Sequence, residues 1–131
     1  MARRASREFT PEPGEVGAAR RFARTVAGEW SVDADGVELV VGELAANAVL
    51  HARSSYSVTL CRDGDWVLVE VADHNARLPI PATVPAQALS GRGLTIVDRL
   101  ARTWGVRPES GGKVVWAELP ASPVRRLWRA G

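Results

Sequence analysis

Apolar residues recur every three or four positions in two segments of the first half of the chain, residues 13–28 and 33–51. This spacing gathers apolar side chains on one face of a helix. Thr10 precedes the first segment and Asp33 opens the second, and their short polar side chains suit the N-cap of a helix. The pattern predicts two amphipathic helices, with Val16, Ala19, Phe22, Ala23 and Val26 on the apolar face of the first and Val37, Val40, Val41, Leu44 and Ala48 on that of the second.

Apolar and polar residues alternate in four shorter segments farther along the chain. An Asp-Gly-Asp connection joins Tyr56–Arg62 to Trp66–Asp73, and a Ser-Gly-Gly connection joins strands expected near Trp104–Arg107 and Lys113–Leu119. Alternation with period two is typical of strands that bury one face, and short glycine-containing connections are typical of hairpins. The sequence therefore predicts two β-hairpins.

Residues 74–92 follow neither pattern, because they contain three prolines and many small residues. A loop of this length is usually functional or mobile. The helical spacing returns at about residues 93–103, which predicts a third helix. This order of elements favours a two-layer α/β sandwich of the α+β kind, in which three helices cover one face of a mixed, mainly antiparallel sheet.

The charge of the chain is concentrated at its two ends. The 131 residues carry a net charge of +2, with 17 basic and 15 acidic residues. The six terminal arginines are Arg3, Arg4, Arg7, Arg125, Arg126 and Arg129. Without them 11 basic residues face 15 acidic ones, a balance of −4. We therefore expect a flexible basic arm at 1–7, one domain at 8–120 and a basic tail at 121–131, and this distribution argues against a nucleic-acid groove in the body of the fold.

Two further features bear on location. The single cysteine, Cys61, cannot form an internal disulfide. No apolar run approaches the roughly 18 residues that a membrane span needs. We therefore expect a cytoplasmic protein that does not cross a membrane.

A polar stripe interrupts the second predicted helix. Glu43, Asn47 and His51 are spaced by four residues and so stack along one side of the helix. They lie at the flank of its apolar face, which is consistent either with the wall of a cleft or with an ordinary solvated face. Asparagine in a helix rich in Ala, Val and Leu mildly favours the cleft.

An aspartate ends the second predicted strand. By period two Asp73 shares a face with Val67, Val69 and Val71, so it either binds a ligand or forms a turn with the residues that follow. Residues 90–93 (Ser-Gly-Arg-Gly) lead directly into the third helix. Glycines at a helix start let backbone N–H groups approach an anion such as phosphate, although a simple capped turn has the same composition.

The order of these motifs resembles one family. Residues 43–52 (ELAANAVLHA) look like the N-box of the histidine-kinase-like ATPases, in particular of the small anti-sigma-factor kinases of actinobacteria. Residues 71–79 (VADHNARLP) resemble the first glycine box of that family and residues 91–97 (GRGLTIV) the second. Residues 112–119 (GKVVWAEL) resemble its closing strand. The resemblance covers about residues 8–119 and implies the Bergerat, or histidine-kinase-like ATPase, fold.

The resemblance implies a nucleotide site that binds ATP and Mg²⁺. Glu43 would be the general base on the hydroxyl that is phosphorylated, Asn47 would coordinate Mg²⁺, and Asp73 would accept a hydrogen bond from the adenine amino group. Gly91 and Gly93 would let the loop close over the phosphates. The remaining positions that it places at the nucleotide are His51, Asn75, Ser90, Arg92, Leu94 and Lys113, with Arg92 as the candidate contact of the γ-phosphate.

The same resemblance implies a function in regulation. The chain would be an ATP-dependent serine/threonine protein kinase that phosphorylates a partner resembling an anti-sigma antagonist, with a sigma factor as its other client, and it would be a homodimer. The alternative is a catalytically inactive module of the same fold that binds nucleotide or partner without transferring phosphate. The first glycine box leaves this alternative open, since Asn75 stands where glycine is usual.

Overall fold

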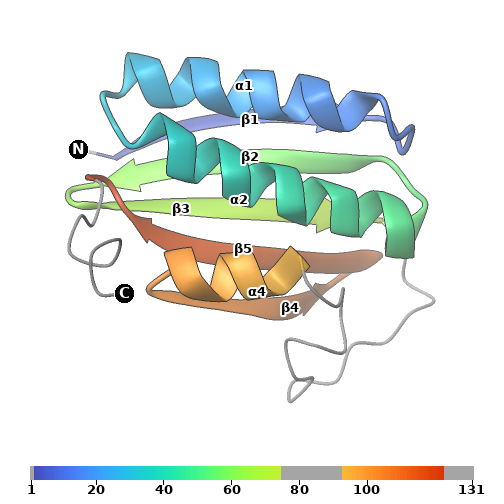
Figure 1. Ribbon diagram of the computed structural model, residues 1–131. Coiled ribbons are helices and arrows are strands. Elements are labelled where there is room, and N and C mark those ends of the chain that lie inside the picture. Colours follow the sequence, from blue (N-terminus) through green and yellow to red (C-terminus); the bar gives the residue numbers. More distant parts are fainter. Residues whose placement is uncertain (1, 75–92, 123–131) are drawn as a thin grey trace.

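The computed structural model describes residues 2–74 and 93–122, which form a five-stranded sheet and the helices packed on it (Figure 1). The strand order is β1-β2-β3-β5-β4, and every neighbouring pair is antiparallel. The strands are β1 (Arg3–Phe9), β2 (Tyr56–Asp63), β3 (Trp66–Asp73), β4 (Thr103–Glu109) and β5 (Gly112–Pro120). The helices are α1 (Glu15–Glu29), α2 (Ala34–Asn47), the π-helix η1 (Ala48–Ala52) and α4 (Gly93–Leu100).

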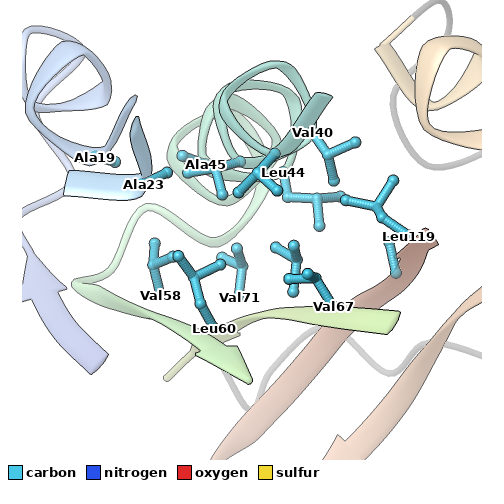
Figure 2. Close-up of a cluster of buried hydrophobic side chains, with 14 of the residues drawn as sticks. Ala19, Ala23, Val40, Leu44, Ala45, Val58, Leu60, Val67, Val71 and Leu119 are labelled. Carbon is cyan, nitrogen blue, oxygen red and sulfur yellow. The ribbon is translucent and has the colours of Figure 1, made fainter. Parts of the chain in front are cut away.

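The helices lie on one face of the sheet, and the core lies between the two layers (Figures 1 and 2). In Figure 2 side chains of α2 lie above those of β2, β3 and β5, and Ala19 and Ala23 of α1 lie beside α2. Buried members of this core are Ala19, Ala23, Val40, Leu44, Ala45, Val58, Leu60, Val67, Val71 and Leu119. The predicted two-layer α+β sandwich is therefore confirmed, and the sheet is antiparallel at every described pairing rather than mixed.

The N-terminal residues differ from the expected flexible arm. Residues 3–9 form β1, which pairs with β2 along its whole length, from Arg3 opposite Arg62 to Phe9 opposite Tyr56. Phe9 is buried in the core and stacks on the Tyr56 ring, with 5.8 Å between the ring centroids. This anchor and the backbone pairing hold the segment in the sheet in spite of its charged composition.

One of the two predicted helix N-caps is confirmed and the other is wrong. Asp33 caps α2, since its carboxylate accepts a hydrogen bond of 3.2 Å from the Gly36 N–H. Thr10 does not cap α1, because that helix begins at Glu15 and Gly14 occupies the N-cap without a side-chain hydrogen bond. The third helix also ends earlier than expected, at Leu100, because the chain turns there to pair with β5.

The second helix reaches about His51, as its spacing predicts, but its last turn is wider than an α-helix. After Asn47 the backbone continues as the π-helix η1, and it ends at Arg53 in the left-handed conformation with φ of 54°. The Arg53 N–H donates to the Ala48 carbonyl, which closes the wide turn. Single π-turns occur often at functional sites.

Candidate functional site

One end of the molecule brings together segments that are far apart in the sequence. Figure 1 shows that α2 and β3 end, and that β5 begins, at the same end of the sheet. The first residue of α4, Gly93, lies at this end as well. The polar residues singled out in the sequence therefore come from elements that meet here.

A row of directly paired residues crosses all five strands at this end. Phe9 pairs with Tyr56, Tyr56 with Asp73, Asp73 with Lys113, and Lys113 with Pro108. Because side chains alternate along a strand, this row shares the helix-covered face with the buried residues of β2, β3 and β5. An aspartate and a lysine thus sit in an otherwise apolar or aromatic row.

Asp73 and Lys113 form a buried ion pair. The Lys113 Nζ donates to Asp73 Oδ2 at 2.6 Å, and the side chains are only 4% and 2% exposed. Asp73 therefore lies on the apolar face of β3, as its spacing predicts, with its carboxylate held by the neighbouring strand. Isolated charges are costly to bury, so a pair of this kind requires close geometry to persist.

Gly112 makes this geometry accessible. A Cβ atom added to Gly112 would lie 1.9 Å from the Asp73 carbonyl oxygen and 2.8 Å from its carbonyl carbon. Only glycine fits such a contact with another backbone. The start of β5 therefore approaches the end of β3 closely, next to the position of Lys113.

Two polar groups at the end of α2 lack partners. Asn47 is 4% exposed, and its Oδ1 atom makes no hydrogen bond within the part of the chain that the structure describes. Glu43 lies one turn earlier on α2, is partly exposed, and forms no ion pair with any described residue. Burying the Asn47 amide oxygen without a hydrogen bond is costly unless it meets a ligand, whereas the partly exposed Glu43 carboxylate stays accessible on the same side of the helix.

A third polar atom, the Tyr56 hydroxyl, is also buried without a hydrogen bond among the described residues. Burial, together with the negative charge of Glu15, raises the pKa of Tyr56 above its ordinary value. The hydroxyl therefore stays protonated over the physiological range. It lies on the residue directly beside Asp73 in the sheet.

A comparison with known protein families identifies the domain to which this arrangement belongs. The model of the histidine kinase-like ATPase domain matches residues 9–119, which is most of the chain. The chain belongs to the histidine-kinase-like ATPase domain family. The expected family is thereby confirmed at this level, and the coarse expectation of an ATP-binding domain with it.

A solved structure supports the fold of this ATPase domain. The chain is similar to the catalytic domain of the histidine kinase ThkA in a nucleotide-free form, with a TM-score of 0.59 and 18% identity. The match covers 91% of this chain and 99% of that one. At this identity the likeness shows the fold. No curated protein matches the sequence.

The donor set of the ATPase domain fits a magnesium ion that a nucleotide shares. Asn47 offers one amide oxygen, a hard ligand of the type that Mg²⁺ prefers. No cluster of three or more His, Cys, Asp or Glu side chains able to hold a metal exists within residues 2–74 and 93–122. Mg²⁺ in nucleotide sites commonly takes one or two protein ligands and completes its shell with phosphates and water.

The other predicted site residues of the ATPase domain divide into two groups. Leu94 is fully buried in the first turn of α4, and His51 is exposed on η1, so His51 does not continue the buried position of Asn47. Their contacts with nucleotide stay predictions. The predicted positions Asn75, Ser90, Gly91 and Arg92 lie outside the described residues.

Two features of the site were not predicted in their present role. Lys113 was expected at the nucleotide but not as the partner of Asp73, and Tyr56 was not singled out at all. For both residues the sequence signal is the alternation of side chains between the two faces of a strand. Lys113 shares a strand face with Val115 and Ala117, and Tyr56 begins the buried face of β2. A polar group at the end of an apolar strand face, such as Lys113 or Tyr56, is therefore a candidate site residue in the same way as Asp73.

One finding concerns membranes. None of the helices in the described residues is long and apolar enough to cross a bilayer.

Proposed function

We propose that this ATPase domain binds Mg·ATP at the end of the sheet described above and transfers the γ-phosphoryl group to a serine or threonine of a partner protein. The partner is a protein resembling an anti-sigma antagonist, and the other client is a sigma factor, whose activity is thereby regulated in the cytoplasm. Family membership and the polar groups at the end of α2 support the proposal.

We propose that the adenine base and the phosphates of ATP contact different elements of the fold. Asp73 accepts the hydrogen bond of the adenine amino group, next to the valines that precede it on the buried face of β3. The first N–H groups of α4 face the phosphates, because a helix N-terminus favours negative charge. Mg²⁺, held in part by Asn47, neutralises charge on the phosphate oxygens.

The observation that carries the proposal is the relation of Glu43 to Asn47. One residue is a partly exposed carboxylate without an ion pair among the described residues, and the other, one turn later, presents a buried amide oxygen without a hydrogen bond there. A general base has to be available to a hydroxyl, whereas a metal ligand has to be fixed near the phosphates. The two residues meet these separate needs.

The reaction is an in-line transfer. The hydroxyl oxygen of the acceptor forms a bond to the γ-phosphorus, the bond from that phosphorus to the bridging oxygen breaks, and ADP leaves. Glu43 takes the hydroxyl proton. Transfer of this kind depends mainly on positioning and on neutralisation of charge.

The surface around Glu43 fits a protein acceptor. Leu39, four residues before Glu43, and Leu50, seven residues after it, are 43% and 66% exposed. A spacing of four places Leu39 on about the same side of α2 as Glu43, and Leu50 lies beyond the end of α2 on η1. Large exposed apolar side chains beside a catalytic base are suited to contact with another protein rather than to activation of water.

Two measurements test the proposal. Isothermal titration should show binding of Mg·ATP, and radiolabelled γ-phosphate should pass to a protein of the anti-sigma-antagonist type encoded in the same genome. Replacement of the acceptor residue by alanine should remove the label. Absence of heat at high protein concentration contradicts nucleotide binding. Binding without labelled protein instead supports the inactive regulatory module.

A further inference from the structure

The ion pair between Asp73 and Lys113 differs from the others in the described residues by its burial. Arg24, Arg102 and Arg107 also pair with carboxylates, but these arginine side chains are 53%, 56% and 46% exposed. Solvent weakens such exposed pairs, so they contribute little. Lys113 and Asp73 are shielded from water, and each charge therefore depends strongly on the other.

Lys113 engages Asp73 as a hydrogen-bond acceptor. The Lys113 Nζ donates to Asp73 Oδ2 at 2.6 Å. A carboxylate held in this way is matched chemically by a ligand group that carries an N–H donor.

The orientation of the carboxylate is fixed at the same time. Lys113 holds Oδ2, and the two residues are direct partners across β3 and β5. The close contact at Gly112 sets the distance between these strand ends. The Asp73 carboxylate is thus held in one place before any ligand arrives, and a preorganised group binds its ligand with less loss of entropy.

We propose that Lys113 is a positioning residue that makes the site select a 6-aminopurine over a 6-oxopurine. The inference rests on the proposed function, in which Asp73 receives the base. An amino group at position 6 donates to the fixed carboxylate. A carbonyl oxygen at the same position places one acceptor against the carboxylate oxygens that Lys113 holds in place, so inosine and guanine nucleotides bind less tightly.

The test compares ATP with ITP, which carries a carbonyl oxygen in place of the amino group. The dissociation constants are measured by titration for the wild type and for Lys113→Met. The wild type should prefer ATP by about 10-fold or more, since one unmatched charged group is worth at least one decade of affinity. In Lys113→Met the ratio of the two constants should fall toward one.

The ratio separates positioning from a purely structural role. A structural defect weakens both nucleotides equally and leaves the ratio unchanged, and this outcome overturns the proposal. Tighter binding of ATP by Lys113→Met also overturns the proposal, because Lys113 would then compete with the adenine base for the Asp73 carboxylate. A wild type that binds ITP as well as ATP overturns it without any variant.

Matched variants complete the experiment. Lys113→Arg retains the positive charge and should keep the preference for ATP. Lys113→Leu also removes both the charge and the donor to Asp73, and it replaces Lys113→Met in the test if that variant does not fold. Arg107→Met removes an exposed ion pair with Glu70 on the other face of the sheet and should leave the ratio unchanged.

Failure of the inference is distinguishable from failure of the proposed function. If the wild type binds no nucleotide, the proposed function fails. Suppose instead that the wild type binds ATP, that Asp73→Asn lowers the affinity for ATP, and that Lys113→Met keeps the wild-type ratio of the ATP and ITP dissociation constants. In that case only the role of Lys113 is wrong.

Discussion

The polar side chains at the two ends of α2 differ in whether they have partners among the described residues. At the first end the Asp33 carboxylate accepts the Gly36 N–H at 3.2 Å, and Arg24 of α1 pairs with both Asp35 and Glu38. Every one of these groups has a partner within the fold. This end is built as a helix start that needs nothing from outside the chain.

At the other end the Asn47 amide oxygen and the Glu43 carboxylate have no such partners among the described residues, and the helix widens into η1. The two ends belong to one helix, so composition alone does not explain the difference. Unsatisfied polar groups reduce stability and persist where they contribute to function. The comparison therefore supports the proposed placement of the ligand at the end of α2.

The largest expected effect follows from Glu43→Gln. Phosphoryl transfer should slow by about 10²–10⁴-fold because the proposed general base is lost, and the dissociation constant of Mg·ATP should stay within about twofold, since the proposal gives Glu43 no contact with the nucleotide. Transfer is followed with labelled ATP and binding by titration. Glu38→Gln, at the opposite end of the same helix, should leave both unchanged. Equal transfer by the wild type and Glu43→Gln removes Glu43 as the base.

An intermediate effect is expected for Asn47→Leu. This change removes a buried amide oxygen that has no hydrogen-bond partner among residues 2–74 and 93–122, so the free energy of unfolding without nucleotide should rise by about 1–3 kcal/mol. Affinity for ATP in the presence of Mg²⁺ should fall by about 10-fold, as for the loss of one charged contact. Denaturant unfolding and titration measure the two quantities.

Asp33→Ala is the control from the other end of α2. Loss of the cap should lower the free energy of unfolding by about 0.5–2 kcal/mol and leave ATP affinity unchanged. The two variants should therefore move stability in opposite directions. A destabilised Asn47→Leu variant would show that the amide is structural.

The smallest effect is expected for Tyr56→Phe and appears at high pH. The folded-state pKa of Tyr56 is raised by burial and then by Glu15, so the neutral hydroxyl is favoured in the folded protein. This contribution to stability is fully present below the unfolded-state pKa of about 10 and is lost as pH rises through the folded-state value. Above pH of about 10 the wild type should lose stability more steeply than Tyr56→Phe. Thermal unfolding across this pH range measures it, and identical slopes would contradict the assignment.

Much of the fold could be predicted because its local signals agree with its packing. The spacing of apolar residues in α2 and the Asp33 cap predict the same helix, and the alternation in β2 and β3 fits the hairpin between them. Residues 3–7 of β1 were expected to belong to a flexible arm, since their charged side chains resemble a solvated segment. Its pairing with β2 is a long-range contact that no local pattern encodes.

The candidate site was predictable in part for the same reason. Glu43 and Asn47 share a helix face, so their spacing places them together. The pairing of Asp73 with Lys113 depends on the register between β3 and β5, which a sequence of two separate strands does not reveal. The widening of the helix into η1 also had no local signal, because Ala48–Ala52 suits an α-helix as well.

The position of β1 at the border of the sheet has a consequence for handling the protein. This strand pairs with β2 on one side, and within the described residues no strand lies on its other side. Its charges, Arg3, Arg4, Arg7 and Glu8, discourage another chain from adding there. Removal of residues 1–9 would uncover the hydrogen-bonding groups of β2 next to its apolar face, so a shortened protein should aggregate more readily than the complete one.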